Sequence, residues 1–274
     1  MKIAVIGASG MTGAAIVDEL SNRRHQVSGI GRNADKIARR DGVTAIAADI
    51  MNVREMATAL SGHDAVVCAY AAGHTLELDV YKNTVEAAWR IKRAIKAAGS
   101  PYLVFLGGVG SLWTEGGEQV LDEPRWPAWY LETASPAYLR HLHAMTHIDA
   151  FELMAAERES IIASGDNPFA PFKSEVAHHF IAAMGTSHQL AQGCRAAWEI
   201  FADDRSFEWT FVSPPWFLMY GPRTGSYETV ADMLPLKGGT PAGISVDDMA
   251  IAVADEAENH AFKYRHWSAM TDLR

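Results

Sequence analysis

The stretch that decides the fold stands at the start of the chain, where residues 1–13 read MKIAVIGASGMTG. An apolar run of strand length, Ile3–Ile6, leads directly into three glycines at three-residue spacing, Gly7, Gly10 and Gly13. Beyond the last glycine, apolar residues recur at helical spacing as far as Leu20. This order of strand, glycine loop and helix predicts the first unit of a dinucleotide-binding fold.

The glycine loop has a physical reason to bind phosphate. Small residues let the backbone turn tightly and approach a pyrophosphate, which is favoured by the free N–H groups and dipole of the next helix. We expect the loop residues Ser9, Met11 and Thr12 to contact the cofactor together with the three glycines. A purely structural turn is the less favoured alternative.

The rest of the first hundred residues alternates short apolar runs with helical patterns, which is typical of βαβ units and a parallel sheet. The pattern predicts an α/β protein with a Rossmann-type, doubly wound parallel sheet in a single domain, residues 1–274. Expected later strands are Gln26–Ile30, Thr44–Ala47, Ala65–Ala69, Tyr102–Leu106 and Glu208–Val212.

Several helix starts carry capping signals. Asn52 and Ser135 are expected N-caps, the latter with Pro136 at the first helical position. The stretch opened by Ser135 should run to the break at Gly165, and a later helix should start with Thr186 as its cap. A last helix should begin at Ser245.

Composition narrows the function. Of 274 residues, 49% are hydrophobic and 21% charged, as in ordinary globular proteins. The net charge of −9 argues against nucleic acid as a general partner. No apolar run approaches the roughly 18 residues that cross a bilayer, and we expect no membrane partner. Cys68 and Cys194 are expected to be reduced, buried thiols, and with no signal peptide visible the chain is expected to be cytoplasmic.

The end of the second strand bears on the choice of cofactor. An NAD site usually places Asp or Glu there for the ribose hydroxyls, whereas an NADP site offers Arg to the 2′-phosphate. The chain has Arg32 there and no acidic residue before Asp35, so NADP (NADPH) is the preferred cofactor. A solvated arginine is the alternative. Asp49 and Ile50, after the third strand, are in position to bracket the adenine.

Several motifs together resemble the atypical short-chain dehydrogenases, in particular the group that contains biliverdin reductase B (flavin reductase) and the NmrA-like NAD(P)H-binding proteins. They are the glycine loop, Arg32-Asn33, residues 48–50, the run GGVGSL at 107–112, WTFVSPP at 209–215, GPRTGSY at 221–227 and ISVDD at 244–248. The resemblance covers about residues 1–130 and 186–270. It implies cofactor contacts at Ala71 and at Pro214, which would shape the nicotinamide pocket.

The chain departs from this group in two places. Members often carry Arg inside the glycine loop, where this chain has Met11, so the preference for NADP rests on Arg32 alone. Residues from about 137 to 185 form a helical insertion near the substrate side. No relative's substrate can therefore be transferred to this chain.

Catalytic groups are harder to identify. Short-chain dehydrogenases commonly use a Tyr-x-x-x-Lys pair for proton transfer, and none of the eight tyrosines has Lys four residues later. The resemblance places Ser111 beside the nicotinamide, and Tyr220 is a second catalytic candidate. A loop serine that caps backbone groups is a nearly equal alternative for Ser111. Tyr70 and His74 are further proton donors to consider, better explained by packing.

A metal site is not expected. His143 and His147 have the four-residue spacing of paired zinc ligands, but no Glu follows His143, and a polar helix face explains them better.

The leading hypothesis is an NADPH-dependent oxidoreductase that reduces a small conjugated or carbonyl substrate, such as a quinone or flavin. Two alternatives stay open: a non-catalytic, NmrA-like redox sensor that acts through a partner protein, and an NAD(P)-dependent epimerase or isomerase. The expected partner is a small-molecule substrate, and a homodimer is considered.

Overall fold

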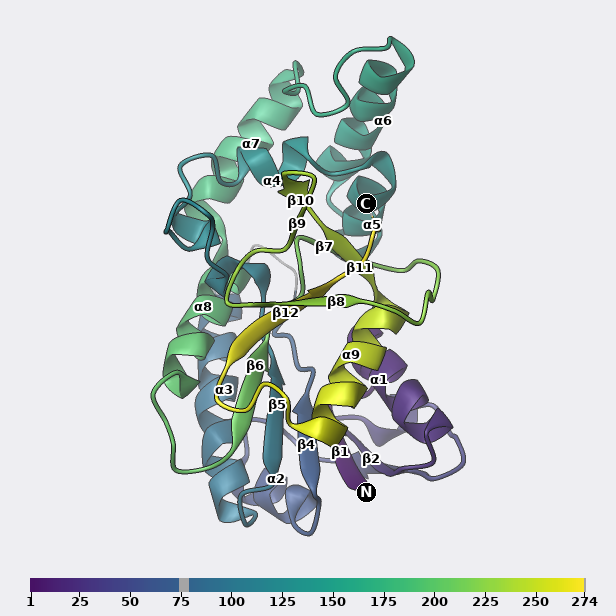
Figure 1. Ribbon diagram of the computed structural model, residues 1–274, viewed down its shortest axis with the longest axis vertical. Helices are drawn as coiled ribbons and strands as arrows, with labels where there is room; N and C mark the ends of the chain where they lie inside the picture. Colours follow the sequence, from purple (N-terminus) through teal and green to yellow (C-terminus); the bar gives the residue numbers. More distant parts are fainter. Residues whose placement is uncertain (74–78, 274) are drawn as a thin grey trace.

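A central sheet of eight strands organises the computed structural model, which describes residues 1–73 and 79–273 (Figure 1). The strand order is β3-β2-β1-β4-β5-β6-β12-β8. The strands are β1 (Lys2–Ile6), β2 (Gln26–Gly31), β3 (Val43–Ala47), β4 (Ala65–Cys68), β5 (Tyr102–Leu106), β6 (Trp209–Val212), β8 (Glu228–Ala231) and β12 (His266–Met270).

The predicted parallel sheet is confirmed for its main part. β1 pairs in parallel with β2 on one side and with β4 on the other, so the strand order reverses between β1 and β4. In such a sheet, ligands bind at the carboxyl ends of the strands next to this reversal. The glycine loop that follows β1 therefore lies at the switch point.

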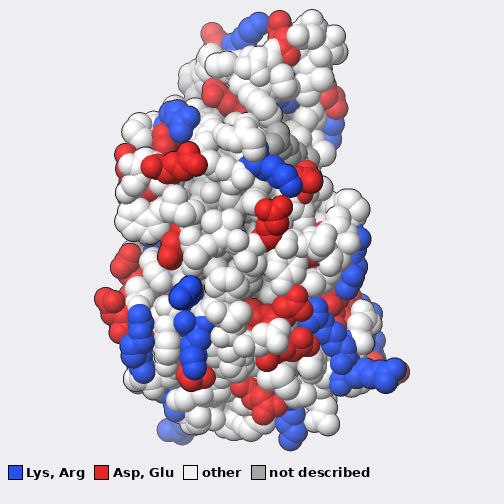
Figure 2. Space-filling view, in the orientation of Figure 1, with Lys and Arg blue, Asp and Glu red and all other residues white. Residues whose placement is uncertain are grey.

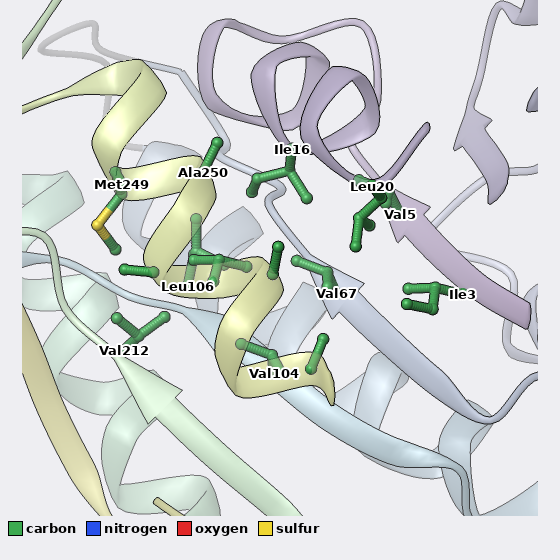
Figure 3. Close-up of a cluster of buried hydrophobic side chains, with 14 of the residues drawn as sticks. Ile3, Val5, Ile16, Leu20, Val67, Val104, Leu106, Val212, Met249 and Ala250 are labelled. Carbon is green, nitrogen blue, oxygen red and sulfur yellow. The ribbon is translucent and has the colours of Figure 1, made fainter. Parts of the chain in front are cut away.

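Helices cover both faces of the sheet. The two faces have separate hydrophobic cores, one with α1 (Met11–Asn22) and α9 (Val246–Asn259), the other with α2 (Val53–Leu60), α3 (Asp79–Ala97) and α8 (Gln189–Phe201). Figure 3 shows the first core, where side chains of α1 and α9 point toward those of β1, β4, β5 and β6. This packing fixes the start of α1, and with it the glycine loop, against the sheet.

A third core lies beyond the carboxyl ends of the strands, at the upper end of Figure 1. It contains helices from the middle of the sequence, namely α4 (Ala128–Glu132), α5 (Pro136–Thr146), α6 (Asp149–Ala163) and α7 (Glu175–Ser187). Its aromatic residues include Tyr130, Trp216 and Phe217. Trp216 and Phe217 follow β6. The helices α4 to α7 therefore pack on the part of the chain that leaves the central sheet after β6.

Two predictions about these helices are wrong. The stretch after Ser135 forms two helices, because His147 takes a left-handed conformation (φ 57°) that ends α5 before α6 begins at Asp149. Residue 186 lies within α7, and α8 begins at Gln189 with His188, not Thr186, as its N-cap residue. The N-caps at Asn52, Ser135 and Ser245 are confirmed by side-chain hydrogen bonds.

One edge of the sheet departs from the parallel arrangement. β8 pairs antiparallel with β12 at the sheet edge, so the sheet is mixed. The strand pattern predicted nothing after Val212, yet six more strands are described there. Beside β8 and β12 these are β7 (Phe217–Met219), β9 (Leu236–Lys237), β10 (Thr240–Pro241) and β11 (Gly243–Ser245). Most have two to four residues, too few to show an alternating pattern.

Three short 3₁₀ helices complete the described elements: η1 (Ala34–Lys36), η2 (Val109–Ser111) and η3 (Val120–Asp122). Cys68 and Cys194 are buried and unpaired, as expected. None of the described helices is long and apolar enough to cross a bilayer. On the face drawn in Figure 2, acidic and basic side chains are interspersed.

Candidate functional site

The glycine loop turns so tightly that Gly7 and Gly13 cannot be replaced without displacing backbone. Gly7 has φ 80°, and a Cβ atom on it would lie 2.7 Å from the carbonyl oxygen of Ala69, which follows β4. A Cβ on Gly13 would lie 2.1 Å from the carbonyl oxygen of Gly7. The backbone N–H of Gly7 donates to the carbonyl of Ile30 at 2.9 Å, which ties the loop to β2.

The loop ends in an uncapped helix start. Gly10, the N-cap residue of α1, offers no side chain to the first-turn N–H groups, and the first turn carries no acidic residue. Helix geometry leaves the N–H groups of Met11, Thr12 and Gly13 without intrahelical acceptors. Ser9 and Gly10 are exposed. This open cradle of N–H groups at the positive end of a helix dipole fits a diphosphate.

Arg32 lies at the neighbouring strand end. Its side chain is exposed after β2, and within residues 1–73 and 79–273 it forms no hydrogen bond or ion pair. Burial raises the pKa of the half-buried Tyr70, and the charge of Arg32 works in the opposite direction. A Cβ on Gly31 would lie 4.0 Å from the Ser9 hydroxyl oxygen. A guanidinium and a hydroxyl group therefore flank the end of β2.

The residues expected to contact the cofactor near the adenine differ in how exposed their side chains are. Asp49 is half-buried, and its Oδ1 accepts from the N–H of Met51 at 3.0 Å, which closes the turn before α2. Ile50 is 5% exposed and belongs to the core beneath α2. Ala71, after β4, is exposed. Contact of these residues with a cofactor stays a prediction, and His74 lies outside the described residues.

The two predicted catalytic residues are far from equivalent. Ser111, in η2, is completely buried, and its hydroxyl donates to the carbonyl of Gly108 at 2.9 Å. Tyr220, directly after β7, is 68% exposed, and its ring has the edge of His141 as a neighbour at 6.0 Å. The structure thus encloses one candidate and presents the other to solvent, with no described contact between them.

The part of the candidate site that is expected to face the nicotinamide consists of backbone. Gly107 and Gly108 follow β5 and are half-buried, and Pro214, after β6, is half-buried as well. A Cβ on Gly107 would lie 2.0 Å from the Phe211 ring, so only glycine fits there. The N–H of Gly107 donates to the carbonyl of Val212 at 2.8 Å and joins the ends of β5 and β6.

Two side chains at this end were not anticipated. Ser213 and His266 are buried beside Ser111 and hydrogen-bonded to each other. The Pro-Pro pair after Ser213 was the available signal for a special strand end. Nothing in the sequence around His266 marks it, because it meets Ser111 across 155 positions of the chain.

Two hollows among the described residues lie elsewhere. One, of about 400 Å³, is lined mainly by α8 residues such as Gln192 and Arg195. Another, of about 510 Å³, lies at the amino ends of β1, β2 and β3 and includes Ser28 and His63. Neither is lined by a glycine-loop residue. We place the candidate site at the loop, because backbone N–H groups without acceptors at a helix start favour anions.

Comparison with known proteins agrees with this geometry. A family model described as NAD(P)H-binding matches residues 7–155. The chain is 28% identical to an uncharacterised Bacillus subtilis (strain 168) protein, YwnB, with 99% of both covered.

Solved structures show the same fold. One from Burkholderia pseudomallei, described as an exported protein, has a TM-score of 0.68 at 26% identity, covering 99% of this chain and 100% of that one. Another, described as an NADH-flavin reductase from Streptococcus pneumoniae, has a TM-score of 0.67 at 21% identity, with 98% and 99% covered.

Proposed function

Because the chain belongs to the NAD(P)H-binding family, we propose that it is an NADPH-dependent oxidoreductase that reduces a small conjugated or carbonyl substrate, such as a quinone or flavin. The observation that carries the proposal is the glycine cradle at the switch point, with Arg32 beside it. The similarity to a structure described as an NADH-flavin reductase supports this class of acceptor.

Each part of the cradle has a role in this proposal. N–H groups of the loop and of the first turn of α1 hold the diphosphate. Arg32 pairs with the 2′-phosphate, with the Ser9 hydroxyl nearby, because a guanidinium binds phosphate through directed, charge-assisted hydrogen bonds. Gly107, Gly108 and Pro214 form the floor for the nicotinamide ring. When bound, the cofactor supplies a hydride.

The choice of a conjugated acceptor follows from the placement of hydroxyl groups. Ser111 is enclosed and already donates to Gly108, so it offers no proton to a substrate in this arrangement. Reduction of a conjugated ring delocalises charge, and water can then protonate the product. Tyr220, which is exposed, is the protein group we propose for proton transfer where the acceptor needs one.

Calorimetric titration with NADPH and NADH tests the binding half of the proposal. We expect binding of both, with NADPH the tighter ligand. NADPH oxidation with a panel of quinones, flavins and enones tests the catalytic half. Tight NADPH binding without turnover of any acceptor would contradict the reductase assignment and leave the binding site intact.

A second candidate function is favoured by the enclosure of Ser111. A protein that binds the dinucleotide without turnover needs no proton donor beside the nicotinamide, and the helices α5 to α7 would be its partner surface. For such a sensor we expect similar affinities for NADPH and NADP⁺ and a stable complex with another protein. For the reductase we expect turnover without that complex.

A further inference from the structure

A buried cluster of three polar side chains joins separate parts of the fold below the proposed nicotinamide floor. Ser111 comes from η2, Ser213 from the end of β6, and His266 is the first residue of β12. The Ser213 hydroxyl oxygen lies 3.0 Å from that of Ser111 and 2.8 Å from Nε2 of His266. All three residues are at most 1% exposed.

The hydrogen bonds of this cluster run in one direction. The single hydroxyl proton of Ser111 goes to the carbonyl of Gly108. Ser213 therefore donates to Ser111, and His266 donates to Ser213 through Nε2–H. The chain of donors begins at the imidazole and ends on the backbone of the turn after β5.

Apolar rings keep the imidazole neutral and fixed. The Trp198 ring stacks on His266 with a centroid separation of 4.7 Å, and Phe211 lies at 5.4 Å, nearly perpendicular. Burial lowers the pKa of His266 to about 3. A neutral imidazole has one N–H group, so its orientation sets the direction of the whole chain. Nδ1 is buried and has no hydrogen-bond partner among the described residues, and Oδ1 of Asp232 lies 3.9 Å from it, beyond hydrogen-bond distance.

The turn at the end of this chain also receives a side-chain hydrogen bond from the buried Gln119, whose Nε2 donates to the carbonyl of Ser111 at 3.2 Å. Gly107 and Gly108 lack side chains, and a Cβ on Gly108 would come within 3.0 Å of the Cys194 sulfur. The Ser111 hydroxyl bond to the Gly108 carbonyl is a side-chain contact that holds this turn. Ser213 directly precedes Pro214. The cluster is therefore connected to both parts of the proposed nicotinamide floor, the Gly107–Gly108 turn and Pro214.

We propose that Ser213 and His266 are positioning residues, which hold Gly107, Gly108 and Pro214 in the arrangement that the nicotinamide ring requires. This proposal rests on the function proposed above. Neither side chain touches the cofactor in it, since both are enclosed. Their effect reaches the ring through Ser111 and the backbone.

The test compares three variants with a matched control. Ser213→Ala removes the central hydroxyl, His266→Phe removes the first donor, and His266→Gln keeps an N–H group that can reach Ser213. Ser268→Ala is the control, because Ser268 is buried two residues along the same strand and its hydroxyl has no partner among the described residues. NADPH affinity is measured by calorimetry, and the surroundings of the reduced nicotinamide by its fluorescence when bound.

We expect Ser213→Ala and His266→Phe to bind NADPH within about threefold of the wild-type affinity, because the phosphates supply most of the binding. The emission of bound NADPH should shift toward that of free NADPH. Turnover with an acceptor should fall by about tenfold to a hundredfold, since small displacements of reacting groups have effects of this size. His266→Gln should recover part of both signals, and Ser268→Ala should match the wild type.

Folded Ser213→Ala protein with wild-type emission of bound NADPH would overturn the proposal, even if its melting temperature were lower. If His266→Phe does not fold, Ser213→Ala alone tests the proposal, because it is the smaller change. Absence of wild-type turnover would contradict the reductase function alone, because the fluorescence comparison needs only binding. Absence of NADPH binding would contradict both.

Discussion

At the scale of single residues, Gly13 leaves the least room for change in the glycine loop. A Cβ atom at position 13 would lie 2.1 Å from the carbonyl oxygen of Gly7. That oxygen belongs to the backbone, so it cannot move aside as the end of a side chain could. We expect Gly13→Ala to lower the free energy of unfolding by at least about 2 kcal/mol and to abolish NADPH binding. Chemical denaturation and calorimetry measure the two effects.

Gly10→Ala is the control for this prediction, because a Cβ there would lie 3.3 Å from the same oxygen. A contact of this length needs only a small adjustment, so most of the stability should remain. Equal losses in the two variants would show that the close approach of Gly13 does not determine the shape of the loop.

Arg32 is the residue that should select between the cofactors. Its guanidinium is exposed and forms no ion pair with the described residues. We expect Arg32→Ala to weaken NADPH binding by about tenfold to a hundredfold, the loss of charge-assisted hydrogen bonds worth about 1.5–3 kcal/mol. NADH affinity should stay constant. Arg39→Ala, which changes another exposed arginine, serves as the control. If Arg32→Ala weakened the binding of NADPH and NADH equally, Arg32 would have no role in selectivity.

At the scale of elements, Asp248 connects the start of α9 to the segment after β7. Its buried carboxylate accepts from the N–H and hydroxyl of Thr224 at 2.9 and 2.8 Å and from the N–H of Gly225 at 3.0 Å. Asp248→Ala leaves these donors unsatisfied. We expect a loss of about 3 kcal/mol in the free energy of unfolding, measured by urea denaturation.

Asp247 provides the matched control for this element. It lies in the same first turn and has the same charge relative to the helix dipole, but its side chain is exposed. Asp247→Ala should therefore lose far less stability. If the two variants were equally stable, the contacts of Asp248 with the segment at Thr224 would contribute nothing measurable.

The elements also show which local structures can be predicted from the amino-acid sequence. Ser135 and Ser245 were predicted as N-caps, and each accepts from the N–H group three residues on. Such bonds lie within one turn of chain, so the sequence encodes them directly. The break at His147 could not be predicted, because a left-handed conformation is uncommon for a residue other than glycine and no Gly or Pro marks this position.

At the scale of the whole molecule, stability should decrease as the pH falls below about 6.5. Burial lowers the pKa of His188 to about 4, whereas an unfolded chain takes up this proton near pH 6.5. Between these two values the unfolded state binds more protons than the folded state, so the stability is complete above pH 6.5 and is lost on acidification. At pH 5 this difference contributes about 2 kcal/mol.

His188→Phe isolates this contribution. The free energy of unfolding of the wild type and the variant is compared at pH 7.5 and 5.0, and the variant should lose about 2 kcal/mol less. His179→Phe, which changes an exposed histidine of α7, should keep the wild-type pH dependence. An unchanged pH dependence in His188→Phe would contradict a neutral, buried His188.

The amino-acid sequence by itself determined the parts that depend on neighbours along the chain. These parts are the glycine loop between β1 and α1, most of the parallel strands, and the helix caps at Asn52, Ser135 and Ser245. Each depends on residues a few positions apart, and backbone sterics or hydrophobic periodicity decide them locally. Short strands such as β7 and the antiparallel β8 carry too few residues for such a pattern.

Only the tertiary structure decided how the site's side chains are used. Ser111 became a candidate through the family resemblance, but its buried partners Ser213 and His266 are 102 and 155 positions away. Which distant segments meet is settled by the packing of the sheet and of the helices on it, and no local pattern records that meeting. The same packing left Tyr220 in solvent.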